Sequence, residues 1–195
     1  MARIEPVPFN DLPAATQEMM EAGTATGMYT TIVPMQIVAY SSAAMTAMHR
    51  SYEATFRTGV LEPRLVELLR LHSANSAMCM PCSASRKDSS ISEDDVACLI
   101  APDPERFTPR EFAALTFYDQ LAHDHHAISD ETFRALNEVF TTAEIVEMAY
   151  LCANSLGVHR LMHAIGAFAS LAGAGDEHVI AYSPGDVDRS HVTDP

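Results

Sequence analysis

The segment of residues 65–71, which reads LVELLRL, is the strongest constraint on how this chain can fold. It follows Glu62 and Pro63, and proline at the first turn of a helix is typical because its missing N–H has no helical partner to lose. Apart from Glu67 and Arg70, the segment is wholly apolar, which is unusual for a helix that lies on a surface. We therefore expect a helix that is buried in the core.

The rest of the chain also favours helices. Two capping boxes, which begin at Thr108 and Thr141, open further helices, and we expect the second of these to continue to Leu171. No region shows sustained alternation of apolar and polar residues with β-branched side chains, so we expect no strand. The predicted fold class is all-α. A chain of 195 residues suffices for one core; residues 1–172 are predicted to form a single helical domain and residues 173–195 a tail or arm.

Charge and composition exclude several classes of function. The formal net charge is −14, whereas binding to nucleic acid or to an anionic membrane needs clustered Lys and Arg. No apolar run reaches the length of a membrane span, and the N-terminus lacks the pattern of a signal peptide. Four cysteines in a chain of this size do not resemble a secreted disulfide scaffold. We expect a cytoplasmic protein.

Two of the cysteines, Cys79 and Cys82, form a C-x-x-C motif directly after the apolar helix. Cysteines at this spacing can close a disulfide with little backbone movement, so the pair can accept or release two electrons. At the start of a helix both would favour the thiolate, and Arg86, one turn further on, adds positive charge. In a reducing compartment such a pair is typical of a catalytic or a metal-binding site.

Glu67 precedes Cys79 by twelve residues and lies on the helix that we expect to be buried. A carboxylate in apolar surroundings is costly unless it is paired, and one that faces a pocket can relay a proton to a thiol. His72 is the nearest imidazole along the sequence that could take part in such a relay. The alternative is that Glu67 forms a structural ion pair with Arg70 or Arg64.

The remaining histidines give weaker signals. His123, His125 and His126 cluster at a predicted helix end, where cations meet the helix dipole favourably, and their spacing matches no helical metal pair. We expect neither a metal nor a cofactor. His159 and His163 stand one turn apart on the last helix, where they are either core histidines with satisfied hydrogen bonds or groups that face the thiols.

Residues 65–71 also resemble residues 145–151, which read IVEMAYL. The valine, the glutamate and the final leucine coincide in the two segments, and each segment falls early in a predicted core helix. A duplicated helical hairpin explains this repetition, although chance can also produce it. With this alignment, His159 takes the position of Cys79.

Together, these features resemble the alkylhydroperoxidase D and carboxymuconolactone decarboxylase superfamily. The resemblance rests on Glu67, on the twelve-residue step to Cys79-x-x-Cys82 and on the helix opening at residues 61–64. It extends from about residue 11 to residue 171, because segments 107–111, 128–133, 145–147 and 158–160 follow in the order that this superfamily uses.

The resemblance implies an all-helical subunit with a duplicated hairpin that assembles into a homo-oligomer, either a trimer, a dimer or a hexamer. It implies an alkylhydroperoxidase-like peroxidase in which Cys82 attacks an organic hydroperoxide, Cys79 resolves the intermediate and Glu67 relays the proton. It further implies that a thiol reductant, such as a dihydrolipoyl group on a partner protein, restores the dithiol.

The chain departs from this pattern at two positions. Arg86 stands where the peroxidase motif usually has a histidine, and Pro81 stands where some members have a histidine or a tyrosine. Two alternatives follow. The first is a cofactor-free lyase, decarboxylase or isomerase for a small carboxylated lactone-type substrate, whose carboxylate Arg86 would bind. The second is a redox sensor without catalytic activity, whose disulfide alters its assembly.

Overall fold

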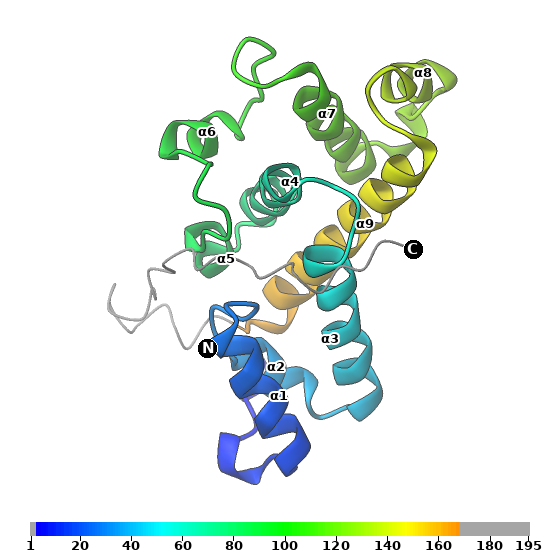
Figure 1. Ribbon diagram of the computed structural model, residues 1–195. Helices are drawn as coiled ribbons and strands as arrows, with labels where there is room; N and C mark the ends of the chain where they lie inside the picture. The colour runs from blue at the N-terminus through cyan, green and yellow to red at the C-terminus, as the bar shows by residue number, and fades with distance from the viewer. Residues whose placement is uncertain (1–2, 168–195) are drawn as a thin grey trace.

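The helix that we expected to be buried, α4 (Pro63–Ser76), lies at the centre of the computed structural model, which describes residues 3–167 (Figure 1). Every residue of α4 from 65 to 74 is buried, including Glu67, Arg70 and His72. Helices α3, α5, α6, α7 and α9 pack around it. The polar groups of α4 must therefore find their partners within the protein.

The other elements, in chain order, are the 3-10 turn η1 (Phe9–Asp11), α1 (Ala14–Ala25), α2 (Val33–Val38), α3 (Ser42–Arg57), α5 (Met80–Ala84), α6 (Glu93–Cys98), α7 (Pro109–His123), the 3-10 turn η2 (His125–Ala127), α8 (Asp130–Val139) and α9 (Thr142–Ile165). No strand occurs among residues 3–167, which confirms the predicted all-α class. Within the same residues, no helix is both long and apolar enough to cross a membrane.

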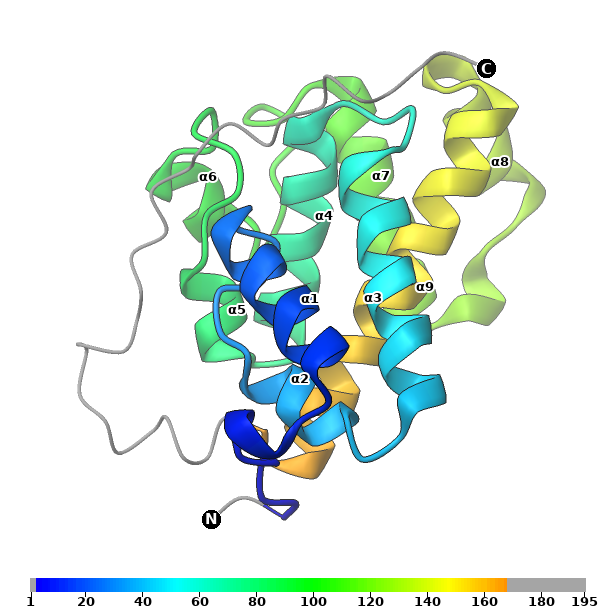
Figure 2. The ribbon, with the colours of Figure 1, turned by 60° about the horizontal axis from the view of Figure 1, so that its bottom comes forward.

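Two hydrophobic clusters make up the core, and α9 contributes to both. The first cluster joins α4, α7 and the first half of α9. The second is rich in methionine and joins the chain from η1 to α3 with Met162 near the end of α9. Figures 1 and 2 show α2 beside the second half of α9, on the side of the molecule that also carries α5. The predicted tail, residues 173–195, lies outside the described residues.

Capping explains where several helices begin and end. The capping boxes at Thr108 and Thr141 are confirmed, and Ser92 and Ser129 form two more. The end of α9 differs from our expectation, because α9 stops at Ile165 and not at residue 171. Gly166 has a φ of 67°, a left-handed conformation that glycine adopts without steric cost and that ends a helix.

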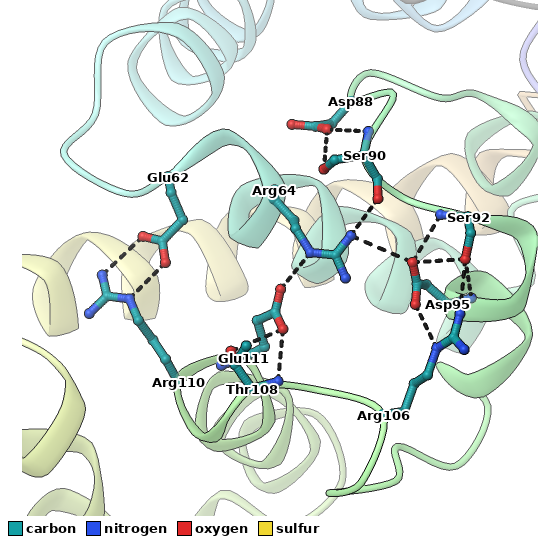
Figure 3. Close-up of polar contacts among 10 residues, drawn as sticks. All are labelled: Glu62, Arg64, Asp88, Ser90, Ser92, Asp95, Arg106, Thr108, Arg110 and Glu111. Atoms are coloured by element: carbon teal, nitrogen blue, oxygen red, sulfur yellow. Dashed lines mark hydrogen bonds and ion pairs between the residues drawn. The ribbon is translucent and has the colours of Figure 1, made fainter.

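Ion pairs fix the N-terminal end of α4 against the first turns of α6 and α7 (Figure 3), and Arg110 of α7 also pairs with the first turn of α9. Arg64 donates to Glu111 of α7 at 2.7 Å. Arg110 donates to Glu62 at 2.7 Å and to Glu144 of α9 at 2.5 Å. These contacts hold one end of the buried helix in place, and the two cysteines follow its other end.

Candidate active site

A tight turn at the end of α4 brings the cysteines back beside this helix. The N–H groups of Met78 and Cys79 donate to the carbonyls of Asn75 and Ala74, respectively, which is the Schellman pattern of helix termination. Met78 has a φ of 53°, a left-handed conformation that is uncommon for a residue other than glycine. The turn ends α4 and lets α5 begin directly after Cys79.

Cys79 and Cys82 form a disulfide across the first turn of α5, with their Cα atoms 5.2 Å apart. This separation lies in the usual range for a disulfide, so closing the bond needs no large movement of the backbone. Cys79 is buried, whereas Cys82 is partly exposed. The other two cysteines, Cys98 and Cys152, are free, and burial raises the pKa of the Cys152 thiol. Of the disulfide pair, Cys82 is therefore the more accessible to a small molecule.

Cys82 lines a cavity of about 60 Å³ between α5, α4, the second half of α9 and the segment that links α1 to α2. A space of this size holds a few water molecules or a group as small as a peroxide. The lining combines sulfur, hydroxyl and basic groups: Met28, Tyr29, Thr30, Thr31, Met35, Tyr52, Arg70, Cys82, Ser85, Lys87 and His159. Burial raises the pKa of both tyrosines, which therefore stay neutral at neutral pH.

Glu67 and Arg70 form a buried ion pair beside this pocket. The two carboxylate oxygens of Glu67 accept hydrogen bonds from Nε and Nη2 of Arg70 at 2.6 Å and 2.7 Å. Arg70 also donates to the carbonyls of Cys82 and Ser85, at 2.7 Å each, and Glu67 accepts the backbone N–H of Lys87 at 2.8 Å. The ion pair that we considered as the structural alternative for Glu67 is therefore present, and it holds the segment that carries Cys82.

Lys87 lies at the end of that segment, and both ends of its side chain are fixed. Its backbone donates to Glu67, and its Nζ donates to the carbonyls of Met28 at 2.6 Å and of Gly27 at 3.3 Å. Burial and the nearby positive charge of Arg70 lower the pKa of the Lys87 amine to about 7, while the negative charge of Glu67 has the opposite effect. A substantial fraction of this amine is therefore neutral at physiological pH.

His159 reaches the pocket from α9. Its Nδ1 lies 2.9 Å from the Ser73 hydroxyl of α4. Burial, together with the positive charges of Arg70 and Lys87, lowers the pKa of His159 to about 3. The imidazole is therefore neutral at physiological pH. The sequence suggested either a hydrogen-bonded core histidine or a group that faces the thiols, and His159 is both hydrogen-bonded and part of the pocket lining.

His72 points elsewhere, although it lies one turn from Glu67. Its Nε2 is 2.7 Å from Asp119 of α7, its ring contacts Tyr118 edge-on, and it is not among the residues that line the pocket. His72 is close to Glu67 in the sequence, but its side chain lies on the side of α4 that α7 covers. The structure therefore does not bring His72 together with the thiols.

Arg86 is also outside the pocket lining. Its guanidinium donates to both carboxylate oxygens of Glu93 at 3.0 Å and 2.9 Å, and to the carbonyls of Ser83 and Ser85. The histidines at positions 123, 125 and 126 are exposed. Among residues 3–167, no group of three or more His, Cys, Asp or Glu side chains could hold a metal ion.

Sequence reasoning missed Lys87, Tyr29 and Tyr52 as parts of the site. The two tyrosines come from α3 and from the segment before α2, and no motif connects them with the cysteines. Lys87 did give a signal, because it is the only lysine among the twelve basic residues of the chain, the others being arginines. A single lysine within a few residues of a C-x-x-C motif deserves consideration as a functional group.

The comparison with solved structures identifies the fold. No protein-family model and no curated protein matches this sequence. A solved structure of an alkylhydroperoxidase AhpD core, an uncharacterized peroxidase-related protein from Ralstonia eutropha JMP134, is similar with a TM-score of 0.69 and 19% sequence identity, over 85% of this chain and 90% of that one. An uncharacterized peroxidase-related protein from Silicibacter sp. TM1040 has a TM-score of 0.69 and 16% identity, over 82% and 87%. The chain thus has the alkylhydroperoxidase D-like fold that its motifs predicted.

Proposed function

We propose that this chain, which has the alkylhydroperoxidase D-like fold, is a thiol-dependent oxidoreductase that reduces small hydroperoxides with Cys79 and Cys82. One observation carries the proposal: the two cysteines are close enough to form a disulfide, and Cys82 lines a small pocket with polar walls. A dithiol that cycles to a disulfide supplies the two electrons that the reduction of a peroxide bond consumes.

The reaction in this proposal has two steps on the protein. The Cys82 thiolate attacks one oxygen of the hydroperoxide, the O–O bond breaks, and the departing alkoxide takes up a proton to become an alcohol. Cys82 is then a sulfenic acid. The Cys79 thiol attacks the Cys82 sulfur, water leaves, and the disulfide forms. A thiol reductant, such as a dihydrolipoyl group on a partner protein, exchanges with this disulfide and restores both thiols.

Glu67 and Arg70 act as positioning residues in this proposal. They bind each other, and the groups that they hold besides are the backbone of Cys82, Ser85 and Lys87. The neutral imidazole of His159 adds a hydrogen-bonding group to the lining of the pocket. The small cavity favours compact peroxides or an extended one whose peroxide group alone enters.

The lyase alternative was motivated by the missing motif histidines and by Arg86 as the group that binds a substrate carboxylate. The structure gives Arg86 no support in that role, because its guanidinium binds the carboxylate of Glu93 outside the pocket lining. The sensor alternative uses the same disulfide but predicts no turnover, so the experiment below separates it from the proposal.

The test follows the mass of the peptide that spans both cysteines. Reduced protein is mixed with tert-butyl hydroperoxide, quenched at short times and digested, and turnover is then measured with an excess of a dithiol. We expect loss of two hydrogens in the wild type, gain of one oxygen in Cys79→Ser, and neither change in this peptide in Cys82→Ser. A wild-type dithiol that stays reduced, or Cys82→Ser protein with undiminished turnover, would contradict the proposal.

A further inference from the structure

Lys87 shares the pocket with Cys82, and its position is set from both ends. Its N–H binds Glu67 at 2.8 Å, and its Nζ binds the carbonyls of Met28 and Gly27. These carbonyls belong to the segment between α1 and α2, which forms part of the pocket lining. The amine therefore has little freedom to turn into solvent.

The hydrogen bonds of Lys87 leave one place for a proton. A neutral amine has two N–H groups and one lone pair, and the two carbonyls of Gly27 and Met28 can accept both N–H groups. The lone pair is then the position at which a third proton binds and from which it leaves. An arginine in this place could not act in this way, because a guanidinium keeps its proton.

The other titratable groups around Lys87 are poorly suited to exchange a proton at neutral pH. From α4 come Arg70, which is permanently charged, and Glu67, whose two oxygens are both hydrogen-bonded. From α9 comes His159, whose lowered pKa of about 3 makes it a weak base. From α3 and the segment before α2 come Tyr52 and Tyr29, whose raised pKa values keep their protons in place.

The group that remains on α5 is Cys82, the nucleophile of the proposed reaction, and an unperturbed cysteine thiol has a pKa of about 8.5. The Lys87 amine, with a pKa of about 7, exchanges its proton most readily at neutral pH. A general acid or base works best when its pKa is close to the pH of the reaction. The pocket thus contains both the nucleophilic sulfur of Cys82 and an amine that can give and take up a proton at neutral pH.

Building on the proposed function, we propose that Lys87, which lines the pocket together with Cys82, is the catalytic proton donor to the leaving oxygen of the hydroperoxide. In this step the Cys82 thiolate forms an S–O bond, the O–O bond breaks and its electron pair stays on the leaving oxygen. The Lys87 ammonium gives that oxygen a proton, so the products are a sulfenic acid, an alcohol and a neutral amine. In each cycle this ammonium forms before the attack, when the neutral amine takes up the proton that the Cys82 thiol gives up as it becomes a thiolate.

The choice of leaving group tests this role directly. An alkyl hydroperoxide expels an alkoxide, which needs a proton, whereas a peracid expels a carboxylate, a much weaker base that does not. In the Cys79→Ser background, the rate of Cys82 oxidation is measured by rapid mixing, once with tert-butyl hydroperoxide and once with peracetic acid. For Lys87→Met we expect the rate with tert-butyl hydroperoxide to fall about 100-fold and the rate with peracetic acid to fall by less than about fivefold, as general acid catalysis predicts.

Lys87→Arg is the matched control for charge. It keeps the positive charge but holds its proton, so we expect the same selective loss with tert-butyl hydroperoxide. Equal slowing of both oxidants, or an unchanged rate with tert-butyl hydroperoxide in either variant, would overturn the role of Lys87. A wild-type protein that reacts with neither oxidant while iodoacetamide still alkylates Cys82 would overturn the proposed function itself, and the role of Lys87 with it. Circular dichroism checks that each variant is folded.

The single lysine offers a second readout. Growth on lysine labelled with ¹³C at Cε gives one protein resonance, which belongs to Lys87. We expect this resonance to titrate near neutral pH. A midpoint near the ordinary lysine value of about 10.4 would contradict the proposal.

Discussion

The carboxylate of Glu67 and the guanidinium of Arg70, one helical turn apart on α4, form a bidentate ion pair whose side chains are only 3% and 4% exposed. The remaining hydrogen bonds of the pair reach the backbone at Cys82, Ser85 and Lys87. The charged groups of the buried helix thus hold the segment that carries the nucleophilic sulfur and the pocket amine.

The first prediction concerns this pair. Glu67→Gln would leave the charge of Arg70 buried without a counter-charge, and breaking a buried pair in this way costs about 3–5 kcal/mol of unfolding free energy. Urea unfolding at neutral pH measures the loss. Glu93→Gln is the control, because Glu93 pairs with Arg86 at the surface and such pairs contribute about 0–1 kcal/mol. Equal, small losses in the two variants would contradict the structural role of Glu67.

The second prediction concerns pH. The pKa of His159 is about 3 in the fold and about 6.5 in the unfolded chain, so below pH 6.5 the unfolded chain binds a proton that the fold does not. Stability therefore falls as the pH falls from 6.5 toward 3, and His159 accounts for a loss of about 2 kcal/mol at pH 5.

Unfolding at pH 7 and pH 5 measures this effect when wild type is compared with His159→Gln, which can still bond to Ser73. We expect the variant to lose less stability than the wild type on acidification. His163→Gln, an exposed position on the same helix, serves as the control and should follow the wild type. If His159→Gln also followed the wild type, the histidine would not be held neutral.

The third prediction concerns Gly59, which precedes α4. A Cβ atom at this position would overlap the Glu147 carboxylate of α9, and this carboxylate accepts the N–H groups of Val60 and Leu61 at 2.8 Å and 3.1 Å. Gly59→Ala must displace it, at a cost of about 2 kcal/mol for the two hydrogen bonds. A double-mutant cycle with Glu147→Ala measures the coupling. We expect Gly59→Ala to cost little once Glu147 is absent, and purely additive losses would show that the overlap is not the cause.

The fourth prediction concerns Arg86, which the sequence placed near the thiols. Because its guanidinium binds Glu93 and two carbonyls outside the pocket lining, Arg86→Ala should change the rate of Cys82 alkylation by iodoacetamide by less than about twofold, as expected for a surface ion pair. Measurement across pH 6–9 at low ionic strength would reveal any effect on the thiolate. A large fall in the rate at pH 7 alone would mean that Arg86 stabilises the thiolate after all.

The sequence alone predicted the helical class, the burial of α4 and the position of the C-x-x-C motif after it. These features are local: a run of apolar residues, a proline at a first turn and capping boxes act within a few residues of themselves, so their consequences can be read along the chain. The predicted end of α9 at residue 171 was several residues too late, because Gly166 adopts a left-handed conformation that ends the helix after Ile165.

The composition of the pocket was decided only by the tertiary structure. Glu67, Arg70 and His72 lie on one helix, and their roles follow from what packs against each side of it: the α5 segment meets the first two, and α7 meets His72. His159 and Lys87 acquire their lowered pKa values in the same way, because burial and neighbouring charges from other segments surround them. Short-range patterns determine where helices begin and end, whereas desolvation and electrostatic interactions depend on neighbours that are distant in sequence, and only the packed fold brings these together.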